Sequence, residues 1–421
     1  MFDILNTISV KFTEEELKEC LRNVSGSDAV VIISIEAGNG SEKKGDSYLS
    51  TIYRFTVEAV AEAQEKDKNI RLHVIAKGIP KNVARRKTFR SLDFFQTEVN
   101  FYNNVWPLMK KLKDSKNFDE ADEVPMVLSS FSNGENDYVA LKDLSFEGYE
   151  TVQRDIGIDQ DYALLFLKLL ANFHALSIAA RHLDPEFEKV ARSLKETYFD
   201  ERFRSWYSGF MENKLNEVIR NAVRTQLDSV YLEKINKFFS SDSYGLVCKL
   251  AKGPPSKLLA VTQGDVWTPN FLVKLQNGRP VNGILIDFQL ARYASITGDL
   301  IQFLYSCISQ EVLLKEWDNL VDEYHRQLSK RIGELGCDPN LITLGDLKED
   351  IQKNGQLGLA MAMESTVMSS LKEHEVPDLD TIQGDEPVPL EQVWDISPFD
   401  DVPRNKRVAF IIKHAVDKGF M

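Results

Sequence analysis

The sequence contains few cysteines, and their positions do not suggest a shared site. Only four occur in 421 residues, far apart from one another: Cys20, Cys248, Cys307 and Cys337. This distribution fits neither the close spacing of metal ligands nor a disulfide framework. We therefore predict free thiols in a reducing interior, which favours a cytoplasmic protein.

Positive charge is scarce relative to negative charge. The 51 Lys and Arg residues face 64 Asp and Glu residues, giving a formal net charge of −13. Nucleic acid and anionic membrane surfaces would be repelled, so neither is expected as a partner. The N-terminus lacks a basic segment followed by an apolar run, and the apolar stretch 29–35 is too short to span a bilayer. The oligomeric state stays open.

The chain also lacks internal repeats and low-complexity tracts. Its composition, with 43% hydrophobic and 27% charged residues, is ordinary for a globular protein. A length of 421 residues is large for one hydrophobic core, so we expect two lobes or domains.

The most informative stretch is a predicted hairpin of two mostly apolar segments, 271–275 and 281–286, separated by a Gly/Pro turn. Asp265 and Asn270 precede the first segment, and Asp287 follows the second. Because the free ends of a hairpin lie side by side, these three side chains are expected to come together.

Two carboxylates and a carboxamide form an all-oxygen set, which suits Mg²⁺ better than zinc. The spacing D-x4-N followed by D-F is also the layout of kinases. In that layout Asp265 accepts the proton of the attacking hydroxyl, while Asn270 and Asp287 hold Mg²⁺. Taken alone, an Asp in a loop is more often a turn or capping residue. The pair Asp287-Phe288 directly after a buried strand favours the kinase interpretation.

Together the two motifs resemble the ecdysteroid kinase-like (CHK kinase-like) family, relatives of choline and aminoglycoside kinases, in Gly264-Asp265-x-Trp267-x-x-Asn270 and Ile286-Asp287-Phe288-Gln289. The resemblance spans roughly residues 45–304. It implies an α+β, bilobal protein-kinase-like fold, with a small antiparallel sheet and one key helix in the first lobe and a larger, mainly helical second lobe. The implied lobes are a nucleotide-binding lobe over 1–143 and a catalytic, acceptor-binding lobe over 144–421. The implied reaction is ATP- and Mg²⁺-dependent phosphorylation of a hydroxyl on a small molecule, with ecdysteroids as the family's named substrate.

Gln263 is a departure from the family pattern, which usually has His before Gly-Asp. In the kinase layout this His packs behind the loop, and Gln can also donate and accept hydrogen bonds. We expect Gln263 to keep the scaffold. The substitution nevertheless motivates an alternative, a nucleotide-binding pseudokinase that acts as a binding module.

The N-terminal part carries candidate nucleotide-binding residues. Strands are predicted over 29–36, 48–60 and 70–77, and the Gly-rich turn between the first two resembles the family's phosphate-binding loop at Gly45, Asp46 and Ser47. Taken alone, a Gly-rich hairpin is more often only a turn, but the resemblance of Gly45-Asp46-Ser47-Tyr48-Leu49-Ser50 to the family's pattern favours the phosphate-binding interpretation.

Lys77 ends the third of these strands, in a V-A-I-K-like run. Glu98 lies in the apolar stripe of a helix predicted over 89–106 and ended by Pro107. A buried carboxylate needs a cation, so Lys77 and Glu98 are expected to pair. An exposed Glu98 at the edge of the stripe is the alternative. The family pattern Phe95-Gln-Thr-Glu98-Val-Asn-Phe101-Tyr102 favours the pair.

Further positions are assigned by the resemblance or by periodicity. Two more strands are predicted over 126–131 and 138–144. Lys142, Asp143 and Leu144 occupy the family's hinge, where backbone groups would meet adenine. His174 lies in an apolar helix predicted over 164–180 and is expected to be a satisfied core histidine rather than a base.

Later segments are predicted mainly from pattern. Asp299 is expected to cap the helix that follows it. The aromatic residues of 198–211 are expected either to pack in the core or to form one wall of an acceptor pocket. Residues 375–401 are predicted to be a partly mobile loop, and a final helix is predicted over 406–418. An Ala-Pro-Glu triplet is absent from the sequence, which argues against a peptide acceptor and hence against a protein kinase.

Overall fold

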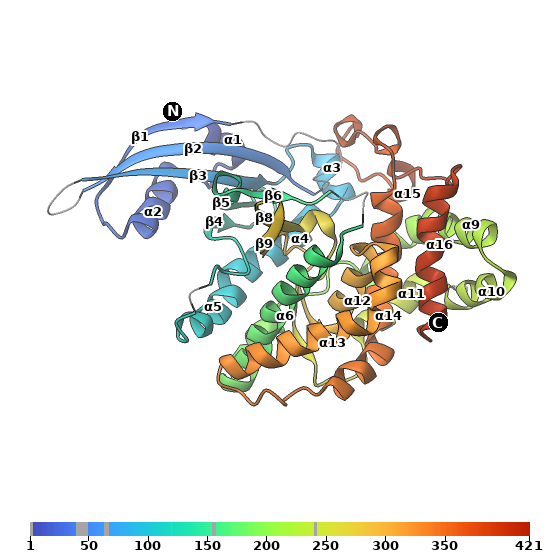
Figure 1. The fold of residues 1–421 in the computed structure, drawn as a ribbon. Helices are drawn as coiled ribbons and strands as arrows, with labels where there is room; N and C mark the ends of the chain where they lie inside the picture. The colour runs from blue at the N-terminus through green and yellow to red at the C-terminus, as the bar shows by residue number, and fades with distance from the viewer. Residues whose placement is uncertain (1–2, 39–48, 63–66, 119, 154–156, 240–241) are drawn as a thin grey trace. The chain divides into compact units, whose positions relative to one another are not determined.

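The structure is a computed structural model that describes residues 3–38, 49–62, 67–118, 120–153, 157–239 and 242–421. The described chain forms two compact units (Figure 1). The first comprises residues 1–103, 124–150 and 378–388, and the second comprises 104–123, 151–377 and 389–421. Three segments fall differently from the predicted lobes 1–143 and 144–421: residues 104–123 group with the second unit, and residues 144–150 and 378–388 group with the first.

An antiparallel sheet organises the first unit. Its five strands lie in the order β1-β2-β3-β5-β4. Their bounds are close to the predicted ones: β1 (Val30–Ala37), β2 (Thr51–Ala61), β3 (Lys68–Gly78), β4 (Val127–Phe131) and β5 (Tyr138–Lys142). Along β3, Leu72, Val74 and Ala76 are buried, whereas His73 and Lys77 on the other face are half-buried. This alternation is the period of two expected for a strand with one core face.

Two short helices cover the buried face of this sheet: α1 (Asp3–Ile8) and α2 (Glu14–Ser25). Thr13 caps α2, because its hydroxyl accepts a hydrogen bond from the Glu16 amide. The apolar face of α2 contributes Leu17 and Leu21 to a core shared with Val57 and Val74 of the sheet. Burial of these side chains therefore joins helices and strands into one packed layer.

The helix predicted over 89–106 is interrupted in the structure. It consists of α4 (Ser91–Asn100), a π-helical turn η1 (Phe101–Val105) and α5 (Trp106–Asp114). The expectation that Pro107 ends the helix is wrong, since Pro107 lies in the first turn of α5. Proline is tolerated there because the first backbone N–H groups of a helix have no intrahelical acceptor.

The second unit is mainly helical and is built around α6 (Gln160–Leu183), green in Figure 1. This helix is the one described helix that is long and apolar enough to cross a membrane, but 83% of its apolar window is buried inside the protein. It packs against α13 (Gln310–Glu334) and against the strand β9 (Arg279–Leu285). We therefore interpret α6 as a core helix.

Two further helices, α12 (Thr297–Ser306) and α14 (Leu344–Ser369), pack closely against each other. A Cβ at Gly358 would lie 2.1 Å from the Gly298 carbonyl oxygen, so only glycine permits this approach. The remaining helices are α3 (Val83–Thr88) in the first unit, and in the second α7 (Phe187–Ala191), α8 (Arg204–Phe210), α9 (Asn216–Gln226), α10 (Ser229–Phe238), α11 (Ser243–Lys252), α15 (Leu390–Val393) and α16 (Val402–Asp417).

Residues 375–401 make defined contacts in the structure. Within the first unit, Arg85 pairs with Asp380 at 2.9 Å, and the Asn82 amide donates to the Ile382 carbonyl at 2.8 Å. The helix α16 begins four residues before its predicted start, because Asp401 caps it by accepting from the Arg404 amide.

Candidate active site

A hairpin in the second unit positions the predicted catalytic cluster. The strands β8 (Phe271–Gln276) and β9 pair antiparallel, with Phe271 opposite Leu285. Asp265 and Asn270 precede β8 and Asp287 follows β9, so all three lie at the same end of the hairpin. The hairpin prediction is confirmed.

The carboxylate of Asp265 is held by two amide side chains. The Asn270 Nδ2 donates to Asp265 Oδ2 at 3.1 Å and to the Asp265 backbone carbonyl at 2.9 Å. The Gln302 Nε2 approaches Oδ1 at 3.4 Å from α12. The sequence analysis missed Gln302. The sequence feature that could have indicated Gln302 is its position as a polar residue within the apolar run of α12, and in the structure it is only 1% exposed.

The electrostatic environment of Asp265 favours its protonated form. The pKa of this carboxyl is raised from 3.8 to about 7, chiefly by burial and then by the nearby charges of Asp287 and Glu364. The hydrogen bonds from Gln302 and Asn270 oppose the shift but do not cancel it. A carboxylate with a pKa near neutrality can both accept and release a proton at physiological pH.

Asp287 occupies a turn immediately after β9. Its φ of 65° lies in the left-handed region, which is uncommon for a residue other than glycine. The Ile286 amide donates to the Asn270 carbonyl at 3.0 Å, so the two loops are joined through their backbones.

Gln263 joins these two loops through its side chain. Its Nε2 donates to the carbonyls of Ile286 at 2.9 Å and Asp287 at 2.7 Å, and its Oε1 accepts from the Asp265 amide at 2.8 Å. Neutral histidine has one donor and one acceptor, whereas this geometry uses two donors and one acceptor. The contacts of Gln263 therefore fit a scaffold role and give no reason to favour the pseudokinase alternative.

Gly264 allows the loop that leads into Asp265 to pass close to the chain after β9. Its φ is 84°, and a Cβ at this position would lie 2.0 Å from the Leu290 carbonyl oxygen. Any other residue would force the loops apart.

Asp299 has a different role from the predicted one. It does not cap α12, whose N-cap is Ile296. Its carboxylate instead accepts from the backbone amides of Gln263 at 2.7 Å and Gly264 at 3.1 Å. Asp299 thus fixes the backbone that leads into Asp265.

His174 supports Asp299 from α6. The ring is fully buried, with Nδ1 2.6 Å from the Tyr324 hydroxyl and Nε2 3.2 Å from Asp299 Oδ2. The prediction of a satisfied core histidine is confirmed.

The donor set at the end of the hairpin fits a hard divalent cation. Asn270 uses its Nδ2 toward Asp265, and within the described chain its Oδ1 accepts no hydrogen bond. That oxygen and the Asp287 carboxylate are oxygen ligands of the kind Mg²⁺ prefers. Clusters of three or more His, Cys, Asp or Glu side chains placed to hold a metal are absent from the described residues, so a cation here would complete its shell with water or substrate oxygens.

In the first unit, Lys77 and Glu98 form the predicted ion pair. The Lys77 Nζ lies 2.9 Å from Glu98 Oε1, and the Glu98 side chain is only 2% exposed. A carboxylate so well buried requires a cationic or hydrogen-bonding partner. The predicted pair is confirmed, and its role toward nucleotide phosphates stays a prediction.

Comparison with known proteins identifies the family. A model of the ecdysteroid kinase-like family matches residues 44–337, more than half of the chain. The chain belongs to the ecdysteroid kinase-like family. No curated protein sequence gives a significant match.

Among solved structures, this ecdysteroid kinase-like protein is similar to Plasmodium vivax ethanolamine kinase, with 11% identity, a TM-score of 0.37, and coverage of 94% of this chain and 85% of that chain. The chain is also similar to a GDP complex of a mutant aminoglycoside 2'-phosphotransferase IIIa. The identity is 12% and the TM-score 0.34, and the match covers 84% of this chain and 98% of that chain. Membership in the ecdysteroid kinase-like family supports a small-molecule phosphotransferase, and the five-stranded antiparallel sheet of the first unit and the mainly helical second unit agree with the α+β fold expected for it.

At the predicted hinge of this ecdysteroid kinase-like protein, the backbone amides of Lys142 and Asp143 already donate hydrogen bonds. The Lys142 amide donates to the Met126 carbonyl at 3.0 Å, and the Asp143 amide donates to the His73 carbonyl at 2.9 Å. The Asp143 carboxylate accepts from Arg54 at 3.1 Å. Adenine recognition by residues 142–144 stays a prediction. Because the amides of Lys142 and Asp143 are already hydrogen-bonded, the contacts with adenine would have to come from the Leu144 amide and from backbone carbonyls.

The predicted phosphate-binding residues Gly45, Asp46 and Ser47 lie outside the described residues.

The aromatic stretch 198–211 of this family member divides into two groups. Tyr207 and Phe210 are 1% and 3% exposed and belong to the core. Tyr198 and Trp206 are half-buried, with ring centroids 5.5 Å apart. The prediction that the aromatic residues of 198–211 form one wall of an acceptor pocket is therefore wrong for Phe210, because the helical face that carries Phe210 is buried in the core.

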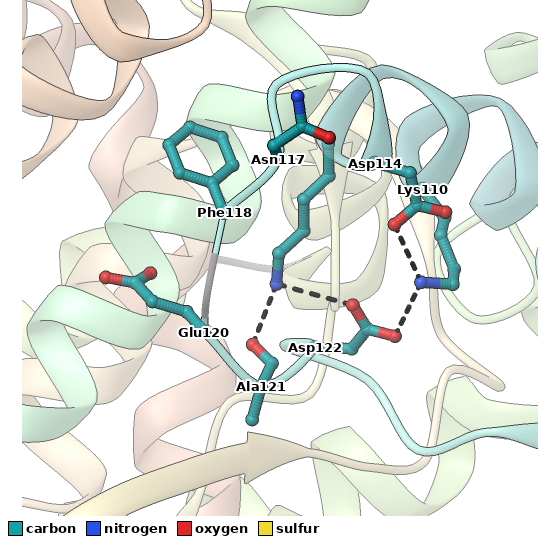
Figure 2. Close-up of a pocket in the computed structure, with 8 residues that line it drawn as sticks. Lys110, Asp114, Asn117, Phe118, Glu120, Ala121 and Asp122 are labelled. Carbon is teal, nitrogen blue, oxygen red and sulfur yellow. Dashed lines mark hydrogen bonds and ion pairs between the residues drawn. The ribbon is translucent and has the colours of Figure 1, made fainter.

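One hollow of the described surface is not lined by any predicted site residue. It has a volume of about 490 Å³ and is lined by residues between Lys110 and Asp122 (Figure 2). Its charges are already paired: Lys110 lies 3.0 Å from Asp114 and 2.9 Å from Asp122, and Lys113 lies 3.4 Å from Asp122. We interpret it as a structural ion-pair network.

Proposed function

We propose that this protein transfers the γ-phosphate of ATP, in a Mg²⁺-dependent reaction, to a hydroxyl of a small molecule, with ecdysteroids and similar steroids or xenobiotics as the first acceptors to test. The observation that carries the proposal is the geometry of Asp265. Its carboxylate is oriented by Asn270 and Gln302 and lies near enough to Asp287 for that charge to raise its pKa. We further propose that the reaction takes place in the cytoplasm.

Asp265 would act as the base. It would accept the proton of the acceptor hydroxyl as the oxygen attacks phosphorus, and its raised pKa suits that step near neutral pH. Asn270 and Gln302 hold the carboxylate in one orientation, which places it against the attacking oxygen without a search among rotamers.

Asn270 Oδ1 and the Asp287 carboxylate would hold Mg²⁺. When bound, the ion neutralises charge that develops on the phosphate oxygens. In the first unit, Lys77 would donate hydrogen bonds to phosphate oxygens, with Glu98 keeping its ammonium in place.

The test is phosphate transfer from labelled ATP to a panel of ecdysteroids, sterols and small alcohols, with and without EDTA, and with a peptide mixture as the comparison acceptor. Asp265→Asn keeps the shape but cannot accept the proton, so turnover should fall by about 10²–10⁴ while nucleotide affinity stays nearly unchanged. Near-normal turnover of this variant would refute the assignment of the base. Nucleotide binding without transfer to any acceptor would support the pseudokinase instead.

A further inference from the structure

A second hollow of the described surface lies in the second unit and contains no predicted site residue. Its volume is about 300 Å³, at the lower end of the size range of pockets that bind small molecules. It is formed by residues 250–255 at the end of α11, by residues 293–295 of the strand β10 (Arg292–Ser295), by the start of the strand β7 (Leu259–Thr262), and by single residues of α12 and α14. We call it the β10 pocket.

The lining of the β10 pocket carries positive charge only. Arg192 and Lys252 line it, and no Asp or Glu is found among the described residues that do so. Lys252 is exposed and forms no ion pair with a described residue; Asp200, which lies near enough to sense its charge, pairs with Arg202 at 2.9 Å. A chain with a formal net charge of −13 repels anions on average, so this pocket is a place where an anion is attracted instead.

Part of the Arg192 guanidinium is available to a ligand. Its Nε and Nη2 both donate to Glu188 Oε1, at 3.0 and 2.6 Å, and the guanidinium lies 5.0 Å from the centre of the Tyr293 ring. Its Nη1 donates to no described residue. Because the carboxylate and the ring hold the guanidinium in place, a second acceptor meets a group that is already oriented.

The first turn of α12 adds a backbone donor to the pocket. Gly298 lines it, and no described residue accepts a hydrogen bond from the Gly298 amide. The first amides of a helix have no intrahelical acceptor, and the helix dipole favours negative charge beside them. Asp350 is bonded to this turn but does not line the pocket, and its carboxylate already accepts from the hydroxyls of Ser295 and Thr297.

Much of the remaining lining is apolar. It includes five side chains without a hydrogen-bonding group: Leu250, Pro254, Pro255, Leu259 and Leu357. The space beside Gly298 is open, because a Cβ there would lie 4.0 Å from Leu357 Cδ2 and no closer to any other atom. Such walls gain free energy from contact with an apolar ligand body and gain nothing from a small inorganic ion.

The β10 pocket is separate from the proposed active site. In the antiparallel pair of β7 and β10, Leu259 lies opposite Ser295 and Thr262 lies opposite Arg292. Leu259 and Ser295 line the pocket, whereas Thr262 is followed by the loop that leads to the proposed base. The length of the strand pair, about 10 Å for three residue steps, therefore separates the pocket from that loop.

We propose that the β10 pocket binds a small organic anion, a carboxylate or a phosphate ester with an apolar body. The anionic group accepts from Lys252, from Nη1 of Arg192 and from the Gly298 amide, and the apolar body contacts the leucine and proline side chains. The inference goes beyond the proposed phosphate transfer and does not rest on it, because the pocket contains none of the residues assigned to that reaction.

The test measures binding of four probes that share a benzene ring: benzoate, phenyl phosphate, benzyl alcohol and benzylamine. Calorimetric titrations with and without ATP compare the wild-type protein with Lys252→Gln and Arg192→Gln. Lys249→Gln is the matched control, because Lys249 is exposed on the same helix as Lys252 but does not line the pocket. Gly298→Leu fills the open space beside Leu357. Melting temperatures without ligand confirm that each variant is folded.

Benzoate or phenyl phosphate should bind the wild-type protein at least about tenfold more tightly than benzyl alcohol or benzylamine, because only the anions form charge-assisted hydrogen bonds with the lining. The tighter of the two anions identifies the carboxylate or the phosphate ester as the ligand class. Lys252→Gln and Arg192→Gln should each weaken its binding about threefold, as expected for a solvent-accessible ion pair, and Lys249→Gln should not. Gly298→Leu should abolish it.

Equal affinity for the anions and benzyl alcohol would overturn the inference, and so would the absence of binding by any probe at millimolar concentration. Unchanged affinity in both Lys252→Gln and Arg192→Gln would overturn it as well. Anion binding that ATP abolishes and Gly298→Leu retains would place the anion in the nucleotide site and refute the β10 pocket. If Gly298→Leu does not fold, the two charge variants and their control decide the result.

Discussion

The raised pKa of Asp265 has a measurable consequence for stability. In the unfolded chain this carboxyl titrates near its ordinary value of 3.8, whereas in the folded protein its pKa is about 7. The folded state therefore binds the proton more tightly, and ionisation of Asp265 destabilises it. The cost is absent below pH 3.8, grows between pH 3.8 and 7, and is fully present above pH 7.

The perturbation is Asp265→Asn, which removes the ionisation and keeps the size of the side chain. At about 1.4 kcal/mol per pH unit, the interval from 3.8 to about 7 corresponds to about 4 kcal/mol. The variant should gain about 1.6 kcal/mol relative to wild type from this source at pH 5 and about 4 kcal/mol at pH 8. Any pH-independent effect of the amide cancels in the difference between the two pH values, which should be about 2.4 kcal/mol.

Urea unfolding of both proteins between pH 5 and pH 8, in EDTA, measures this difference. EDTA matters because a cation at Asp287 would remove one of the charges that raise the Asp265 pKa. The exposed Asp385 offers the control, and Asp385→Asn should show the same pH dependence as wild type. Parallel curves for wild type and Asp265→Asn would refute the reasoning, because they would show that Asp265 titrates equally in the folded and unfolded states.

Three further predictions follow from the site. Mg²⁺ should increase the rise in melting temperature that ATP causes, and Asp287→Asn should remove most of that increment; an undiminished increment would show that Asp287 does not hold the ion. Gln263→Leu should lower both melting temperature and turnover relative to the wild-type protein. Gln263→His should give values between those of the wild-type protein and Gln263→Leu, because His can keep only part of the hydrogen bonds. Equal values for all three proteins would show that the side chain does not order the loops. Phe210→Ala should destabilise the fold by about 3–5 kcal/mol, whereas Trp206→Ala should mainly raise the acceptor KM, and the opposite pattern in unfolding and kinetic assays would reverse the assignment of core and surface.

Local pattern was sufficient for the elements that carry the chemistry. The alternation along β3, the Gly/Pro turn of the hairpin and the spacing from Asp265 to Asn270 each depend on residues close together in the sequence. Strand period and turn chemistry are local properties of the backbone, so they can be read without knowing what the strand packs against. The ion pair of Lys77 with Glu98 was also predictable, because a carboxylate in an apolar stripe needs a cation.

Local pattern was misleading where a helix boundary or a side-chain partner depended on distant residues. Pro107 begins a helix rather than ending one, since proline is compatible with both positions and only the π-helical turn before it decides between them. Asp299 resembles a cap by its place before an apolar helix, yet its partners are the amides of Gln263 and Gly264, 35 or more residues away in the sequence.

Only the tertiary structure could bring Glu364, Gln302 and Tyr198 to Asp265. They come from α14, α12 and the segment before α8, and nothing in their local sequence marks them as neighbours of the catalytic loop. The sequence alone determined which residues could act as base and metal ligands, because that depends on functional groups and short spacing. The pKa of Asp265 was decided by packing, because burial and long-range charge exist only once the helices have come together.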